Sequence, residues 1–167
     1  MKKVKITAML LLAFMCFPAA NITKAKLQHD EDSFNNLIEK TEKQSDNAER
    51  HWSRLIQAIS MTESGGDARA VSRCGRYVGH LQISKVMVRT CNEIAGYRKY
   101  KYSDRYNHDK SVQMFIEFQT EFNPEADIEY AIRLWNTGDI DCMKNKRSSE
   151  SYYRRVMKNY KALGEVV

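Results

Sequence analysis

Proline and glycine are scarce in this chain, with 2 Pro and 7 Gly among 167 residues. All-β sandwiches and barrels need many tight turns that draw on these two residues, so the scarcity argues against both folds. Hydrophobic residues make up 43% of the chain and charged residues 29%, which excludes wholesale disorder and collagen-like or mucin-like sequences. The length fits one domain, and the composition therefore predicts a mainly α fold of short helices.

Long apolar runs are also missing, apart from one near the amino terminus. Three lysines precede an apolar stretch over residues 6–17, and small residues follow that stretch. This order predicts a signal peptide over residues 1–20, with cleavage as late as residue 25, and a protein that is exported to the periplasm or secreted. A spanning helix needs about 20 apolar residues, so we expect no stable membrane insertion after signal removal. A membrane anchor and a lipoprotein modified at Cys16 are the alternatives.

A strong excess of one charge is absent once the signal is removed. The full chain carries a formal charge of +6, and loss of the three lysines in residues 1–20 leaves +3. Such mild basicity suits an anionic partner such as the cell wall and argues against nucleic acid as the partner.

Cysteine is sparse too, because only Cys74, Cys91 and Cys142 lie beyond the predicted signal. In an oxidising compartment they allow one disulfide plus a free thiol, with Cys74–Cys91 closing the shortest loop; three buried thiols are the alternative. A cysteine peptidase would have to pair Cys91 with His108 or Cys74 with His80, and the surrounding residues fit this poorly. The histidines lack ligand-like spacing, so we expect no metal and no cofactor.

The chain divides into a polar segment over residues 21–47, a spacer or an outer helix, and a compact domain over residues 48–167. The domain opens with apolar residues at positions i, i+3, i+4 and i+7, which is typical of an amphipathic helix: Trp52, Leu55, Ile56 and Ile59. Alternating residues over 78–83 predict a short strand and a small hairpin. Further helices are predicted from Ser84 to Gly96, from Asp109 to Phe122, from Pro124 onward, and through Tyr153 to Gly164.

Glu63 lies four residues past Ile59 on the helix face that must be buried, and Gly65 and Gly66 follow it. Burial and the negative end of the helix dipole both disfavour a charged carboxylate, so Glu63 is expected to hold a proton near neutral pH. A carboxylic acid of this kind supplies the proton that glycosidic cleavage needs on the leaving oxygen. The structural alternative is a solvated glutamate at a helix end.

Four motifs in order resemble the soluble lytic transglycosylases, glycoside hydrolase family 23, which are related to goose-type lysozymes. They are Glu63-Ser64-Gly65-Gly66, Ala70-Val71-Ser72, Val78-Gly79-His80-Leu81-Gln82-Ile83 and Leu134-Trp135-Asn136-Thr137-Gly138. The resemblance covers residues 48–163. It implies a mainly α, lysozyme-like fold with a small β-hairpin element, in which one glutamate at a helix end faces a sugar-binding cleft.

The resemblance also implies roles for individual residues. Glu63 matches the single catalytic acid/base, and a further set matches the substrate-binding positions: Ser64, Ser72, Gly79, Gln82, Trp135, Asn136 and Tyr152. Trp135 stands where relatives have a tyrosine, and His80 stands where a small or apolar residue is common. These departures concern glycan contacts and the rate more than the class of reaction.

The implied reaction cuts the β-1,4 bond between N-acetylmuramic acid and N-acetylglucosamine in peptidoglycan and leaves a 1,6-anhydromuramyl product. No second acid has an equally suitable setting, which agrees with a mechanism that uses one carboxyl and the substrate's own N-acetyl group. A goose-type-lysozyme-like hydrolase and a non-catalytic peptidoglycan adaptor for an envelope-spanning apparatus remain alternatives. A monomer is expected. The aromatic and basic stretch over residues 97–106 is either a solvated loop or an extension of the glycan cleft.

Overall fold

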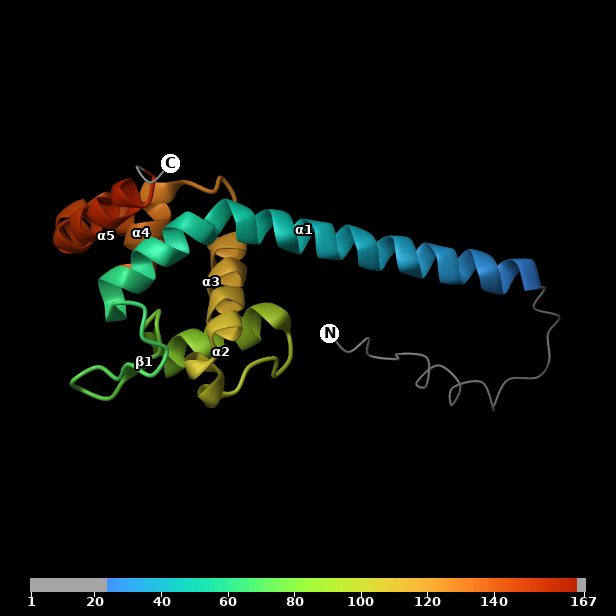
Figure 1. Cartoon of the computed structure of the whole chain (residues 1–167), viewed down its shortest axis with the longest axis horizontal. Helices are drawn as coiled ribbons and strands as arrows, with labels where there is room; N and C mark the ends of the chain where they lie inside the picture. Colours follow the sequence, from blue (N-terminus) through green and yellow to red (C-terminus); the bar gives the residue numbers. More distant parts are fainter. Residues whose placement is uncertain (1–23, 165–167) are drawn as a thin grey trace. The chain divides into compact units, whose positions relative to one another are not determined.

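The computed structural model describes residues 24–164, which are mostly helical (Figure 1). The elements follow in the order α1 (Lys24–Ser64), β1 (Tyr77–Val78), β2 (Ile83–Ser84), α2 (Lys85–Ala95), η2 (Tyr102–Tyr106), α3 (His108–Phe122), α4 (Ile128–Thr137), η3 (Cys142–Ser149) and α5 (Glu150–Ala162). The predicted signal peptide over residues 1–20 lies outside the described residues. Within them, no helix is both long and apolar enough to cross a membrane.

The chain forms two units, Met1–Gln44 and Ser45–Val167. In the first unit, residues 24–44 are helical and expose the apolar side chains of Phe34, Leu37 and Ile38. The sequence predicted either a spacer or an outer helix over residues 21–47, and the structure shows a helix from residue 24 onward.

The core of the second unit forms around the last turns of α1. Leu55 and Ile59 are fully buried there, and Trp52 packs edge-on against Phe115 of α3 with the ring centroids 5.9 Å apart. In Figure 1, α2 and α3 lie largely below this part of α1, and α4 and α5 lie above it. The mainly α fold predicted from the sequence is confirmed, and the apolar stripe is the face that α1 buries.

Both predicted limits of α2 are met, whereas two other predicted helix starts are not. Ser84 caps α2 by accepting a hydrogen bond from the Met87 amide, and Gly96 ends the helix in the left-handed conformation. The prediction that a helix starts at Pro124 is wrong, because α4 begins at Ile128. The side chain of Asn123 bonds both the carbonyl and the amide of Asp127 (2.9 and 3.1 Å), which holds residues 123–127 in a turn, and Asp127 caps the helix.

A similar shift affects the helix predicted to open at Asp109. Asn107 caps α3 by accepting a hydrogen bond from the Lys110 amide, so the helix begins at His108.

The predicted hairpin is present, but the strand does not run through residues 78–83. β1 and β2 pair antiparallel with Val78 opposite Ile83, and residues 79–82 form the turn between them. Gly79 and Gln82 both have positive φ values (79° and 48°), which interrupt an extended strand. The alternation of apolar and polar residues was misleading because His80 and Leu81 are both buried.

The three described cysteines are free thiols, so the disulfide considered between Cys74 and Cys91 is not formed. Cys91 and Cys142 are buried and Cys74 is exposed. The alternative of buried thiols therefore holds for two of the three.

Candidate active site

Glu63 lies in the last turn of α1, one residue before the helix ends at Ser64. Gly65 and Gly66 follow with φ values of 66° and 89°, a conformation that glycine adopts without strain and that turns the chain away from the helix axis. The Tyr152 hydroxyl, from the first turn of α5, donates a hydrogen bond to Glu63 Oε1 at 2.7 Å. Two segments that are 89 residues apart in the sequence thus meet at one carboxyl.

Burial raises the pKa of the Glu63 carboxyl above its ordinary value of 4.5. The hydrogen bond from Tyr152 and the charge of Arg155 both lower this pKa, and they offset only part of the effect. Burial and the neighbouring Glu63 charge raise the pKa of Tyr152 well above 10, so the phenol stays a donor. Glu63 is thus better able to hold a proton than a solvated glutamate.

A cavity of about 350 Å³ opens beside Glu63. Of the eight residues that the sequence places in the site, five line it: Glu63, Ser72, Gln82, Trp135 and Asn136. Tyr77, Ile83, Ser84 and Met87 complete the wall and come from the hairpin and α2. Parts of the chain that the motifs identified separately therefore meet around one carboxyl.

The other three predicted residues do not line the cavity but contact residues or segments that do. Tyr152 contacts Glu63 directly, as described above. Ser64 donates a hydrogen bond from its hydroxyl to the His80 carbonyl at 2.9 Å, which ties the end of α1 to the hairpin turn. Gly79 lies where a Cβ atom would come within 1.9 Å of the Arg105 carbonyl oxygen, so no other residue fits without displacing the backbone.

Gln82 is held in the same turn. Its side-chain amide nitrogen donates to the Gly79 carbonyl at 2.9 Å, and its φ of 48° is unusual for a residue with a side chain. The backbone strain and the internal hydrogen bond fix the side chain at the cavity wall. Ser72 is fixed in a comparable way, since its hydroxyl accepts a hydrogen bond from the Tyr77 amide at 3.0 Å.

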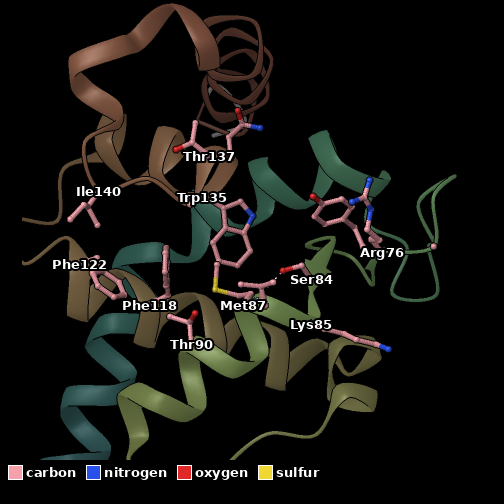
Figure 2. Close-up of a pocket in the computed structure, with 15 residues that line it drawn as sticks. Arg76, Ser84, Lys85, Met87, Thr90, Phe118, Phe122, Trp135, Thr137 and Ile140 are labelled. Carbon is pink, nitrogen blue, oxygen red and sulfur yellow. Dashed lines mark hydrogen bonds between the residues drawn. The ribbon is translucent and has the colours of Figure 1, made fainter.

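A larger cavity of about 770 Å³ continues from the first, and Figure 2 shows its lining. The two cavities share Tyr77, Ser84, Met87, Trp135 and Asn136, so they form one groove. Trp135 stands in the middle, with Phe118, Phe122 and Ile140 toward one end and Arg76 and Lys85 toward the other (Figure 2). An aromatic ring at the centre of an open groove suits stacking on a sugar face.

Trp135 is itself held by aromatic neighbours. Its ring centroid lies 4.9 Å from that of Phe115 and 6.1 Å from that of Phe118. A tryptophan brings no hydroxyl at this position, and the hydroxyl that contacts Glu63 comes from Tyr152 instead.

Arg133 is a supporting residue that the sequence analysis did not identify. It is 2% exposed, and its guanidinium bonds Glu129 and Glu150 at 2.8 Å each. It also donates to the Lys146 carbonyl at 2.8 Å and to the Ser149 hydroxyl at 3.0 Å. These contacts join α4 to η3 and to the start of α5, the helix that carries Tyr152. An arginine among apolar residues of a helix was the available signal.

His80, the residue that departs from the pattern of relatives, is buried rather than placed in the groove. Its Nδ1 lies 3.1 Å from the Ser60 hydroxyl, and its ring stacks on that of His108 with the centroids 4.4 Å apart. Burial lowers the pKa of His80 below 6.5, with a smaller contribution in the same direction from His108. The imidazole is therefore neutral at neutral pH and acts as a packing residue.

The thiols give no support to a cysteine peptidase. Burial raises the pKa of Cys91 to about 12, and its sulfur lies 3.5 Å from the Met114 carbonyl oxygen, so this thiol is not a ready nucleophile. Hydrogen bonds from Ser72 and Arg76 lower the pKa of the exposed Cys74 to about 7, but its side-chain neighbours are these two residues and not a histidine.

The aromatic and basic stretch over residues 97–106 does not line the groove. Tyr100 is buried, and its hydroxyl donates to Glu117 at 2.7 Å, which makes it a core residue. Tyr97 and Arg98 border a separate hollow on the surface near the end of α2. The idea that this stretch extends the glycan cleft gains no support from its position.

A helical domain with a small hairpin and a half-buried glutamate at a helix end, facing an open groove, defines a lysozyme-like class of protein. The family model for the transglycosylase SLT domain matches residues 40–157, and the chain belongs to this family. Its members act on peptidoglycan. Comparison with curated proteins and comparison with solved structures found no match for this chain.

Proposed function

We propose that this protein is a peptidoglycan lytic transglycosylase with Glu63 as its single acid/base. The bond cut is the β-1,4 link between N-acetylmuramic acid and N-acetylglucosamine, and the product ends in a 1,6-anhydromuramyl group. The observation that carries this proposal is the half-buried Glu63 carboxyl, which faces the groove and accepts a hydrogen bond from Tyr152.

The first step uses the raised pKa of Glu63. The protonated carboxyl gives its proton to the glycosidic oxygen as the bond from that oxygen to the muramyl C1 breaks. The carbonyl oxygen of the muramyl N-acetyl group then bonds to C1, and the positive charge that develops there spreads onto the N-acetyl group. The Tyr152 hydroxyl, which donates to Glu63 Oε1, stabilises the carboxylate that this proton transfer leaves behind.

The second step returns the proton. The muramyl 6-hydroxyl attacks C1 while the Glu63 carboxylate removes its hydrogen, and the bond from C1 to the N-acetyl oxygen breaks. The ring closes and the acid form of Glu63 is restored. Attack by water in place of the 6-hydroxyl would give a lysozyme-type product from the same intermediate.

The remaining site residues are proposed to hold the glycan. Trp135 offers its ring to a sugar face, and Asn136 offers an amide at the groove surface. Ser72 and Gln82 line the same cavity, with their own positions fixed by the hydrogen bonds described above. Ser64 and Gly79 support these residues from behind.

Mass spectrometry of the products released from purified peptidoglycan tests the proposal. The unmutated protein is expected to release 1,6-anhydromuropeptides, and Glu63→Gln, which keeps the size and removes the acid, is expected to release none. Glu49→Gln, an exposed glutamate of the same helix, is the matched control and is expected to behave like the unmutated protein. Anhydromuropeptides released equally by Glu63→Gln would refute the assignment.

Two other results would favour the alternatives. Reducing-end muropeptides that depend on Glu63 would show a hydrolase of the same bond. No Glu63-dependent product, with binding to peptidoglycan intact, would favour a non-catalytic adaptor.

We further propose that the protein acts outside the cytoplasm, where peptidoglycan lies, after removal of residues 1–20. We also propose that it acts as a monomer. The mass of the protein recovered from the periplasm or the medium would establish the cleavage site, and retention of the full-length chain in the cytoplasm would contradict export.

A further inference from the structure

Two cations lie together at one end of the groove. Arg76 and Lys85 line the larger cavity, and Figure 2 shows both on the side of Trp135 that faces away from Phe122 and Ile140. No aspartate or glutamate lines this cavity. Among the residues described, neither Arg76 nor Lys85 is paired with a carboxylate. The charge at this end of the groove is thus not balanced by acidic side chains of the lining.

The segments that carry both cations are tied together by a buried arginine. Arg105 is 6% exposed, and its guanidinium donates to the Tyr102 carbonyl at 2.8 Å and to the Ile83 carbonyl at 3.1 Å. It also donates to the carbonyl of Arg76 itself, at 3.3 Å. Lys85 follows two residues after Ile83, and its ammonium group lies 5.3 Å from the centre of the Tyr102 ring.

The start of α2 adds to the positive potential at this point. Lys85 is the first residue of an 11-residue helix, and the first turn of that helix contains no acidic residue. The amino-terminal end of a helix favours anions, so the backbone and the two side chains act in the same direction. This end of the groove is therefore suited to an anionic ligand.

Peptidoglycan consists of glycan strands and peptide stems, and only the stems carry free carboxylates. The N-acetylated sugars are neutral, and the lactyl carboxyl of the muramyl residue is consumed in the amide bond to the peptide stem. The free carboxylates lie on the stem. Neutral sugar rings offer no negative charge to Arg76 and Lys85, which have no carboxylate partner among the described residues, whereas the stem offers carboxylates.

We propose that Arg76 and Lys85 bind the carboxylates of the peptide stem, and that the protein therefore prefers glycan that still carries its peptides. This inference rests on the proposed function, since it places a muramyl residue beside Glu63. The cavity beside Glu63 and the larger cavity share Tyr77 and Ser84, which are next to Arg76 and Lys85 in the sequence. A stem that leaves that muramyl residue therefore enters the end of the groove where these two cations lie.

The test compares two substrates with the same glycan strands, intact peptidoglycan and peptidoglycan that an amidase has stripped of its peptides. Because the amidase frees the lactyl carboxyl of each muramyl residue, these carboxyls are converted to simple amides before the assay. For Arg76→Gln/Lys85→Gln we expect the ratio of kcat/KM on intact material to kcat/KM on stripped material to fall about tenfold, equivalent to about 1.4 kcal/mol. The charge-retaining Arg76→Lys/Lys85→Arg is expected to preserve most of this ratio. Arg73→Gln/Arg89→Gln is the matched control, because it removes two exposed cations from the same loop and helix that do not line the groove.

A ratio that stays at its unmutated value in Arg76→Gln/Lys85→Gln would overturn the proposal, whether both activities fall together or neither falls. An equal loss on both substrates would mean that the cations contact the glycan itself. An equal fall of the ratio in Arg73→Gln/Arg89→Gln would mean that overall charge, and not this end of the groove, attracts the substrate.

A binding measurement keeps the test independent of catalysis. Calorimetry with a disaccharide of N-acetylglucosamine and N-acetylmuramic acid, carrying either its peptide or a simple amide on the lactyl carboxyl, reads the affinity that the peptide adds. We expect the peptide to tighten binding to the unmutated protein and to Glu63→Gln by about tenfold, and to add little in Arg76→Gln/Lys85→Gln. If no Glu63-dependent product forms but this difference is seen, the proposed reaction fails and the stem site stands. If the peptide adds no affinity, the stem site fails.

Discussion

Arg133 offers the sharpest test of how the site is held in place. Replacing it with methionine keeps an unbranched side chain and removes a guanidinium that is 2% exposed and joins two carboxylates, a carbonyl and a hydroxyl. Breaking a buried ion pair from one side costs about 3–5 kcal/mol. The Glu129 and Glu150 side chains are 31% and 37% exposed and regain contact with water, so the lower end of that range, about 3 kcal/mol, is expected.

For a domain of this size a loss of about 3 kcal/mol lowers the Tm by about 10 °C. Urea unfolding and thermal unfolding of Arg133→Met both measure the change. Arg154→Met is the control, because Arg154 also bonds Glu150 at 2.7 Å but its side chain is 78% exposed. A change within about 0.5 kcal/mol is expected there. Equal effects of the two substitutions would refute the argument that burial gives Arg133 its importance.

Three further predictions follow from single contacts. Tyr152→Phe removes the hydrogen bond that lowers the pKa of Glu63, so the alkaline limb of the kcat/KM profile is expected to move to higher pH; an unchanged limb would contradict the role of Glu63 as the acid. Because burial lowers the pKa of His80 in the folded state, its contribution to stability is complete above about pH 6.5 and is lost as the pH falls below that value. Denaturant unfolding between pH 7.5 and 5 should show a steeper loss for the unmutated protein than for His80→Gln, and equal slopes would contradict it. Gly79→Ala forces a Cβ atom against the Arg105 carbonyl, and a loss of more than about 1 kcal/mol is expected in urea unfolding, where a neutral result would show that the two backbones can separate freely.

Helix positions could be predicted from the sequence where a local signal decides them. The stripe of Leu55 and Ile59 predicted the buried face of α1, and Ser84 with Gly96 predicted both ends of α2. These features depend on residues within a few positions of one another. The strand over residues 78–83 and the helix start at Pro124 were wrong because contacts with other segments decide both. Gly79 turns where the backbone of Arg105 approaches it, and Asn123 closes its turn through Asp127.

The same distinction applies to the site. Glu63 was identified because its position on an apolar face is itself a local signal, and the structure gives that carboxyl partial burial and a raised pKa, in the direction that the pattern predicted. The resemblance to a known family supplied Tyr152, since no local pattern relates it to a residue 89 positions away. Tyr77 and Met87 line the cavity without any such signal, because they belong to surfaces that meet only in the folded chain.

The two buried arginines show what sequence patterns miss in a basic chain. Among 27 Lys and Arg residues, any one arginine is expected to be solvated, and nothing local separates Arg105 from its exposed neighbours. Yet Arg105 joins the hairpin to η2, and Arg133 joins α4 to η3 and α5. Each guanidinium replaces its lost hydration with several fixed acceptors, which a single lysine ammonium would match less well. Arg105 thereby holds the segments that carry Arg76 and Lys85, and Arg133 holds the helix that brings Tyr152 to Glu63. The geometry of the site thus depends on residues that do not line it.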